Sequence, residues 1–289
     1  MRVIISGGDG FIGRHLREHL SSQKLEIKNL SRLEGYDLSE ECLKDVGHAD
    51  AVIHLAAKTY VPDSRINPKF LFKENFLSTL NLLEYARCEG INKFIYLSSY
   101  VYGKPIYLPV NEEHPLNIDN PYGRSKLLCE SLCRSYAEDF GMNIVIVRPF
   151  NIYGLGQDNR FLLPTIMNQA IDKDSENIVL NDLSPKRDFL YIKDLVAILE
   201  KILDNPPSSN LSVINLGFGR SYSVSDIAQK LLNAFNIKKN VIQKGSKRDN
   251  EILDCYADIS YLKERYNWKP KFDMDQGLKD MYRSLKKEF

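Results

Sequence analysis

A serine, a tyrosine and a lysine are the residues of this chain whose types and spacing could carry out proton transfer. Ser98 follows the apolar run FIYL, and Tyr122 and Lys126 lie four residues apart in PYGRSK. That separation places two side chains on one face of a helix, and a nearby ammonium lowers the pKa of a phenol. Tyr122 could then act as an acid or base near neutral pH, with the Ser98 hydroxyl bonded to the same substrate oxygen.

A glycine-rich turn near the start of the chain supplies a second chemical signal. SGGDGFIG places Gly7, Gly8, Gly10 and Gly13 between an apolar run and an amphipathic segment. Glycines there permit a tight turn, let backbone N–H groups approach a pyrophosphate and let the next helix pack close to the sheet. We therefore predict a dinucleotide site. A tyrosine and a lysine alone are more typical of a solvated helix end, but the turn makes the catalytic interpretation favoured.

Ser31 and Arg32 lie where the type of dinucleotide can be decided. They stand about 20 residues beyond the turn, where this kind of fold usually has an acidic residue for the ribose. An arginine there can pair with the 2′-phosphate of NADP, whereas a carboxylate would repel it. The next acidic residue, Glu34, is expected past the end of the strand. The pair favours NADP(H) over NAD(H), although an isolated arginine can equally be a solvated loop residue.

The elements that must position these residues alternate between apolar strands and helices. Strands are predicted at 3–6, 25–30, 51–57, 94–99, 143–149 and 213–217, with helices after the glycine turn and at 40–46, 68–90 and 123–140. Continuous apolar strands separated by helices indicate an α/β fold with a doubly wound parallel sheet, covered on both faces. The stretches 159–187 and 218–289 are less regular and are predicted to form a smaller domain.

Composition and charge exclude several classes of protein. The net charge of +1 gives no broad basic surface for nucleic acid or an anionic membrane. No apolar run approaches membrane-spanning length, and the first residues lack the apolar segment of a secretory signal. The five cysteines suggest no disulfide framework, and Cys129 and Cys133 are expected to be buried thiols. We expect a cytoplasmic protein that binds neither nucleic acid, membrane nor metal.

Several segments together resemble the extended short-chain dehydrogenases/reductases, in their nucleotide-sugar epimerase/dehydratase group. They are SGGDGFIG, DAVIHLAA, NFLSTLNLLEYA, LSSYVYG, YGRSK, RPFNIYGLGQ, RDFLYIKDLV, INLG and YNWKP, in the expected order. The resemblance implies a Rossmann domain, residues 1–158 and 188–217, that binds a nicotinamide cofactor. It also implies a smaller C-terminal α/β domain, residues 159–187 and 218–289, that binds a nucleotide-diphosphate sugar. Helices like 68–90 and 123–140 usually form a homodimer interface in this family.

The resemblance also implies roles for individual residues. Ser98 would polarise the sugar carbonyl, Tyr122 would transfer the proton, and Lys126 would contact the nicotinamide ribose. Residues expected to bind the cofactor are Gly7, Gly10, Phe11, Ile12, Gly13, Ser31, Arg32, Leu55, Ala56, Ala57, Asn75 and Lys126. Residues expected to bind the substrate are Ser98, Ser99, Tyr122, Asn151, Arg187, Arg248 and Glu251. Asn250 replaces a glycine that relatives often have between the last two.

The family carries out several reactions, and the sequence favours one of them. A 4,6-dehydratase usually has an Asp–Glu pair after the serine, and residues 99–102 contain no carboxylate. An NAD-dependent 4-epimerase of UDP-glucose or UDP-N-acetylglucosamine type and an NADPH-dependent reductase of a 4-keto-6-deoxyhexose both remain. HLAAKTYVPDS and GYDLSE are similar to GDP-6-deoxy-D-mannose reductases, which, with Arg32, favours the reductase, in the synthesis of surface polysaccharide precursors. A non-catalytic cofactor sensor is disfavoured because serine, tyrosine and lysine are all present.

Overall fold

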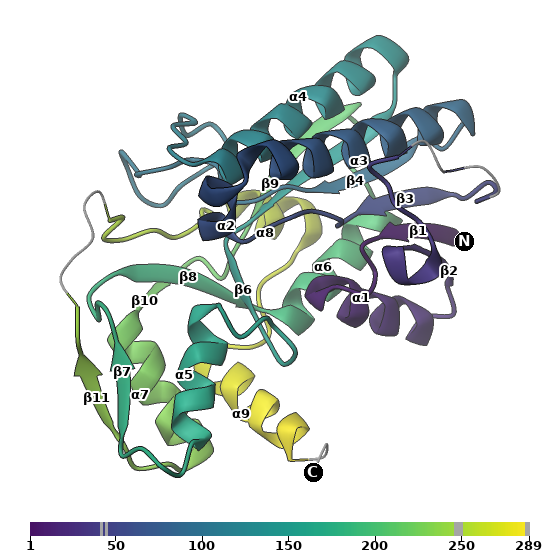
Figure 1. Ribbon diagram of the computed structural model, residues 1–289. Coiled ribbons are helices and arrows are strands. Elements are labelled where there is room, and N and C mark those ends of the chain that lie inside the picture. Colours follow the sequence, from purple (N-terminus) through teal and green to yellow (C-terminus); the bar gives the residue numbers. More distant parts are fainter. Residues whose placement is uncertain (41–42, 44–45, 246–250, 287–289) are drawn as a thin grey trace. The chain divides into compact units, whose positions relative to one another are not determined.

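The chain folds into two compact units in the computed structural model (Figure 1). The structure describes residues 1–40, 43, 46–245 and 251–286. The first unit comprises residues 1–103, 115–149 and 196–215, and the second comprises 104–114, 150–195 and 216–289. These boundaries differ from the predicted ones chiefly because residues 104–114, 150–158 and 188–195 fold with the second unit.

A six-stranded sheet forms the centre of the first unit. Its strands are β1 (Arg2–Ser6), β2 (Glu26–Leu30), β3 (Ala51–His54), β4 (Lys93–Leu97), β5 (Asn143–Pro149) and β9 (Leu211–Leu216). They are arranged in the order β2-β1-β3-β4-β5-β9, and the neighbours from β2 to β5 pair in parallel. The predicted parallel sheet is confirmed. The chain leaves β1 first toward one edge and then toward the other, and ligands bind at the carboxyl ends of strands at such a reversal.

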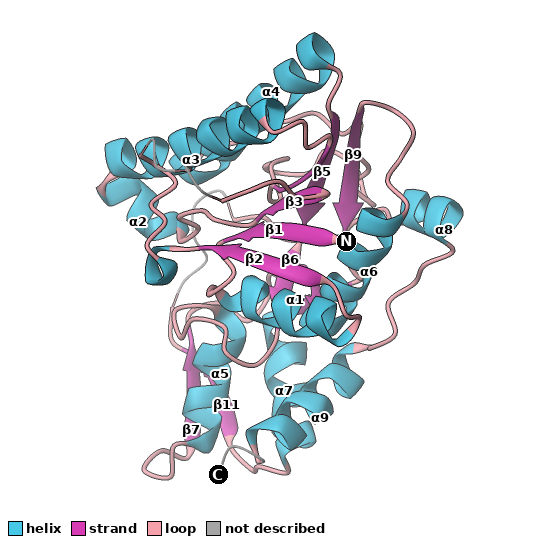
Figure 2. Cartoon of the chain, turned by 90° about the vertical axis from the view of Figure 1, so that its right-hand side faces the viewer, coloured by secondary structure: helices cyan, strands magenta, loops and turns pink. Residues whose placement is uncertain are grey.

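Helices cover both faces of this sheet (Figure 2). α3 (Pro68–Cys88) and α4 (Pro121–Phe140) lie side by side on one face, and α1 (Phe11–Ser22) lies on the other. The shorter elements are η1 (Arg32–Glu34) and α2 (Val61–Ile66), and α6 (Ile192–Asp204) crosses the boundary of the two units. Consecutive strand residues such as Ile4 and Ile5 are both fully buried. Covered faces therefore explain why the strands are continuously apolar.

The second unit contains more regular structure than the sequence suggested. β6 (Asn151–Tyr153), β8 (Lys186–Tyr191) and β10 (Ser221–Ser223) form one sheet, and β7 (Asn177–Leu180) pairs with β11 (Asn240–Gln243). Its helices are α5 (Leu162–Ile171), α7 (Val224–Phe235), α8 (Ser260–Tyr266) and α9 (Met274–Leu285). The prediction of less regular structure in 159–187 and 218–289 was therefore wrong. Two capping boxes, Ser223 with Asp226 and Asp273 with Gln276, begin α7 and α9 and were visible as a sequence pattern.

Three sequence expectations can be compared only with the residues that the structure describes. The helix predicted at 40–46 falls mostly outside the described residues. Over the described residues, no helix combines the length and apolar character that crossing a membrane requires. In the same part of the chain, no three His, Cys, Asp or Glu side chains are grouped so as to hold a metal ion.

Candidate active site

The glycine turn between β1 and α1 is packed so closely that side chains are excluded from it. A Cβ on Gly13 would lie 2.3 Å from the carbonyl oxygen of Gly7 and 2.5 Å from the Cα of Gly8. Gly7 itself has a φ of +70°, and its Cβ would lie 2.8 Å from the Cα of Ala56. Both contacts are with backbone, which cannot rotate away. These glycines therefore bring the first strand, the third strand's end and α1 together.

The beginning of α1 is open to an anion. Gly10 is its N-cap, makes no side-chain cap, and the first turn of the helix contains no acidic residue. The first N–H groups of a helix lack intrahelical partners, and the helix dipole favours negative charge beside them. Phe11, Ile12 and Gly13, predicted to bind cofactor, supply these groups. The turn and the uncapped helix end therefore fit the pyrophosphate of a dinucleotide.

The segment after β3 lies next to the glycine turn, and buried side chains hold its backbone in place. The strand ends at His54, and the backbone N–H groups of Leu55 and Ala56 donate to the Ser6 hydroxyl oxygen at 3.1 and 3.2 Å. Asn75 accepts from the Lys58 N–H at 2.7 Å and donates to the Lys58 carbonyl at 3.2 Å. Asn75 is buried, so in this structure it acts by holding the backbone of the predicted cofactor segment.

His54 is the buried centre of a hydrogen-bond chain behind that segment. The Thr79 hydroxyl donates to the Asn75 carbonyl at 2.7 Å, so it accepts from the His54 Nε2–H at 3.0 Å. The Nδ1 atom then accepts from the Ser6 hydroxyl at 2.6 Å. Burial, and next the charge of Lys126, lower the pKa of His54 to about 3. The imidazole is therefore neutral, and each of its two nitrogens has one role.

His54 should make the stability of the protein depend on pH. Between pH 6.5 and 3 the unfolded chain takes up a proton at this imidazole that the folded chain does not, so stability falls as the pH falls. Lowering the pH from 7 to 5 should reduce the free energy of unfolding by about 2 kcal/mol through His54 alone. Urea unfolding of wild type and His54→Gln at both pH values should show a smaller loss in the variant. The exposed His48→Gln is the control and should lose as much stability as wild type. An equal loss in His54→Gln and wild type would contradict the assignment of this pH dependence to His54.

The end of β2 holds Ser31 and Arg32 beside several carboxylates. The Ser31 hydroxyl donates to the Asp9 carboxylate, which lies in the glycine turn. Glu34 lies beyond the strand, as expected, yet its carboxylate returns to accept from the Asn29 amide at 2.9 Å. Sequence reasoning overlooked Asp9 because it considered only the residues that follow β2. The end of β2, where the ribose of the dinucleotide is expected, therefore contains both a hydroxyl group and carboxylate groups.

Arg32 is not simply a solvated loop residue. It begins η1, and its guanidinium forms an ion pair with Asp37, whose nearest contact is 3.0 Å, and a second one with Glu74 of α3. The Asp37 and Glu74 hydrogen bonds raise the pKa of Arg32, and Arg32 is the main cause that lowers the pKa of Asp37 to about 2. About half of the Arg32 side chain remains exposed. It can therefore reach an incoming anion, but only in competition with two carboxylates.

The predicted catalytic residues come together at the end of β4 and the start of α4, with one difference. Ser98 is buried, and its hydroxyl donates to the Glu130 carboxylate at 2.5 Å. Ser99 is half-buried, and its side chain acts to lower the pKa of Tyr122. The resemblance assigned the carbonyl-polarising role to Ser98. In this structure the Ser98 hydroxyl is bonded to Glu130, and Ser99 is the serine whose side chain lowers the pKa of Tyr122.

The protonation states of Tyr122 and Lys126 also differ from the simple expectation. The Lys126 ammonium is buried and donates to the Leu97 carbonyl at 2.8 Å. Burial raises the pKa of Tyr122, against the lowering effect of the Ser99 hydrogen bond. Burial also lowers the pKa of Lys126 to about 8. Tyr122 is therefore a phenol near neutral pH, ready to donate a proton, and the expected lowering of its pKa by Lys126 is not seen.

The substrate residues predicted in the second unit form their own cluster. Arg187 of β8 donates to the Glu251 carboxylate and to the Ile252 carbonyl, both at 2.5 Å. The Asn151 amide donates to the Asp188 carbonyl at 3.0 Å. Arg248 lies outside the described residues. The structure thus brings Arg187 and Glu251 into direct contact.

Asp188 is a residue that sequence reasoning missed, although it follows Arg187 in the RDF segment. Its buried carboxylate accepts from the N–H groups of Phe218, Gly219 and Ala257 at 2.7, 2.9 and 3.1 Å. Burial raises its pKa to about 6, although the three hydrogen bonds act to lower it. Asp188 therefore joins segments far apart in the sequence and holds β8, and so Arg187, in place.

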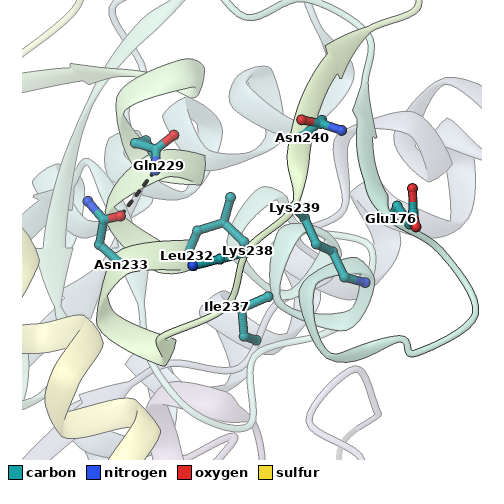
Figure 3. Close-up of a pocket in the computed structure, with 8 residues that line it drawn as sticks. All are labelled: Glu176, Gln229, Leu232, Asn233, Ile237, Lys238, Lys239 and Asn240. Carbon is teal, nitrogen blue, oxygen red and sulfur yellow. Dashed lines mark hydrogen bonds between the residues drawn. The ribbon is translucent and has the colours of Figure 1, made fainter.

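A separate pocket lies wholly within the second unit, at the end of α7 and beside β11 (Figure 3). Its Gln229 and Asn233 amides bond each other at 3.1 Å. The Lys239 ammonium donates to the carbonyl oxygens of Gln169 and Asp172. Among the described residues, none of those predicted to bind cofactor or substrate lines it. It is therefore not the candidate active site.

Comparison with known proteins identifies the family to which a chain with these site residues belongs. A sequence model of the NAD dependent epimerase/dehydratase family matches residues 3–217. The chain belongs to that family. It is 31% identical to a putative UDP-glucose 4-epimerase of Methanocaldococcus jannaschii, over 98% of both chains. It is 30% identical to the GDP-6-deoxy-D-mannose reductase of Pseudomonas aeruginosa, over 96% of this chain and 95% of the relative.

Solved structures agree with this family membership. The structure of RMD from Pseudomonas aeruginosa complexed with NADPH has a TM-score of 0.91 and 29% sequence identity, over 100% of this chain and 99% of that one. The Rossmann-type fold inferred from the sequence is thus confirmed. The protein is an enzyme of the nucleotide-sugar reductase, epimerase and dehydratase group, with an NAD(P) cofactor. The glycine turn and open α1 terminus described above fit that cofactor.

Proposed function

We propose that this enzyme is an NADPH-dependent reductase of a nucleotide-diphosphate 4-keto-6-deoxyhexose, acting in the synthesis of surface polysaccharide precursors. The observation that carries the proposal is the position of Ser31 and Arg32 at the end of β2. A hydroxyl and a half-exposed guanidinium suit a 2′-phosphate. Similarity to a GDP-6-deoxy-D-mannose reductase, and to a structure complexed with NADPH, supports the choice.

Tyr122 has the protonation state that ketone reduction requires. A bound NADPH supplies the hydride for the sugar carbonyl carbon. Tyr122 donates its phenolic proton to the carbonyl oxygen as negative charge develops there, since burial keeps the phenol protonated. Ser99 beside it donates a second hydrogen bond to the same oxygen. Lys126, held against the Leu97 carbonyl, lies one helical turn from Tyr122, where it would contact the ribose of a bound cofactor.

The second unit supplies the groups that would hold the sugar nucleotide. Arg187, whose planar guanidinium suits phosphate oxygens, is proposed to bind the diphosphate together with Arg248. Glu251 holds Arg187 in its present orientation, and Asn151 lies on β6 beside β8. We also propose that the enzyme is cytoplasmic and forms a homodimer through α3 and α4, where Leu128 is 43% exposed.

An NAD-dependent 4-epimerase is the second candidate, and a specific observation favours it. Asp37 and Glu74 already neutralise Arg32, and Asp9 and Glu34 lie beside Ser31 and Asn29. Carboxylates at this position suit the free 2′-hydroxyl of NAD and repel a 2′-phosphate. The similarity to a putative UDP-glucose 4-epimerase points the same way.

Identifying the bound nucleotide separates the two candidates. The purified protein is denatured and any released nucleotide identified, and the emptied protein is then titrated with NADPH and with NADH. For a reductase we expect an exchangeable site that prefers NADPH, and Arg32→Ala should weaken NADPH binding by about tenfold because one charge-assisted contact is lost. NADH affinity should hardly change. Arg283→Ala, an exposed arginine of α9, is the control.

Two other results would count against the reductase. Tightly held NAD at one equivalent per chain would make the enzyme an epimerase. An unchanged preference in Arg32→Ala would show that Arg32 stays with Asp37 and Glu74 and plays no part in cofactor choice. Turnover of a 4-keto sugar with NADPH, measured by loss of NADPH absorbance, would complete the assignment.

A further inference from the structure

One face of α4 contacts three consecutive residues at the end of β4. Tyr122, Lys126 and Glu130 lie at intervals of four along the helix, so their side chains share that face. The Glu130 carboxylate accepts from the Ser98 hydroxyl, and the Lys126 ammonium donates to the carbonyl of the residue before it. Ser99, the next residue, acts to lower the pKa of Tyr122. The Ser98–Ser99 segment therefore lies against this one face of α4.

Glu130 is itself held by a buried arginine of β5. Arg148 donates to one carboxylate oxygen at 3.0 Å and to the other at 2.6 Å, which is a bidentate arrangement. Ser98, Glu130 and Arg148 are each at most 5% exposed. A buried charge pair of this kind keeps its geometry because neither charge can turn toward solvent.

The arginine is in turn linked through Tyr102 to the neighbouring edge strand β9. Its Nη1 donates to the Tyr102 hydroxyl at 3.0 Å, and that hydroxyl donates to the Asn215 side-chain oxygen at 2.5 Å. The guanidinium also lies over the Tyr102 ring, 5.0 Å from its centre. Tyr102 and Asn215 are fully buried. The chain of contacts runs from α4 through β5 to β9, all within the first unit.

We propose that Glu130 and Arg148 are positioning residues that orient the Ser98–Ser99 segment, so that Ser99 faces the reacting oxygen beside Tyr122. Ser98 is the point of attachment, because its proton is committed to Glu130 and its backbone N–H to the Val147 carbonyl at 2.8 Å. Fixing Ser98 at both its hydroxyl and its backbone N–H also fixes the backbone that carries Ser99. The proposal rests on the proposed function only in taking Tyr122 and Ser99 as the groups that meet the substrate.

A double substitution tests whether the pair positions or only stabilises. Glu130→Met/Arg148→Met removes both buried charges together, so no unpaired charge is left inside the protein. We expect unfolding close to wild type, cofactor affinity and KM within about twofold, and kcat lowered at least tenfold because Ser99 is no longer held. Ser131→Ala, an exposed serine of the same helix, is the matched control and should behave as wild type. A double variant with wild-type kcat would overturn the proposal.

A second measurement needs no substrate and separates this inference from the assignment of the reaction. With ring-labelled tyrosine, the 13Cζ resonance of Tyr122 is identified by its absence in Tyr122→Phe, and it reports the hydrogen bond to the phenol. Ser99→Ala and the double variant should both shift it, whereas Ser131→Ala should not. If the double variant does not fold, Ser98→Ala removes the attachment alone and should shift it too. An unmoved resonance in Ser98→Ala would overturn the proposal, even if the enzyme is an epimerase.

Discussion

Replacing Tyr122 with phenylalanine is expected to lower kcat by about a thousandfold or more, while the cofactor still binds. The change removes only the phenolic oxygen, and positioned general acids contribute roughly 10²–10⁴ to a rate. Turnover should be measured under saturating substrate, with cofactor affinity followed by fluorescence titration.

A neighbouring tyrosine provides the control for this variant. Tyr100 also follows β4, but its hydroxyl donates to the Gly103 carbonyl at 2.6 Å. Tyr100→Phe should therefore leave kcat within a few fold of wild type. If Tyr122→Phe retained more than a tenth of wild-type kcat, proton transfer would have to be assigned to another group.

Replacing Gly13 with alanine is expected to abolish measurable cofactor binding. Its Cβ would enter backbone of the glycine turn, with the Gly7 carbonyl oxygen only 2.3 Å away. α1 would have to move off the sheet, which takes its open N-terminus away from the pyrophosphate site. We expect at least a hundredfold loss of affinity in calorimetric titration and a lower unfolding midpoint in urea.

A glycine in open space separates this effect from the general cost of adding a methyl group. Gly90 follows α3 with a φ of +68°, and no atom lies within 4 Å of the position that a Cβ would take there. Gly90→Ala should cost only about 1–2 kcal/mol of stability, from the left-handed backbone, and should leave cofactor binding intact. Equal cofactor affinity in Gly13→Ala and Gly90→Ala would show that close packing of the turn is unimportant.

The first unit could be predicted from the sequence because its signals are local. Apolar runs bounded by helical periodicity located the six strands of the sheet, and the glycines between β1 and α1 located the turn. The four-residue separation of Tyr122 and Lys126 fixed their common helix face. Each of these signals lies within a single strand, turn or helix, so it can be read from neighbouring residues.

The second unit was less predictable because its elements depend on distant partners. β6, β8 and β10 are three to six residues long and meet only in the folded chain. The carboxylate of Asp188 in β8 accepts from N–H groups 30 to 69 residues away. No local pattern announces such contacts. The capping boxes of α7 and α9 were the local exception.

The sequence by itself determined the family, the parallel sheet and the residues from which the site is built. Only the tertiary structure decided how those residues are used. Ser98 and Ser99 are adjacent and chemically identical, and only the folded chain gives one of them, Ser98, the buried Glu130 carboxylate as a partner. The partner of Arg32 on α3 lies 42 residues away. Hydrogen bonds and ion pairs between distant segments form only when the chain has folded, so spacing along the sequence cannot assign them.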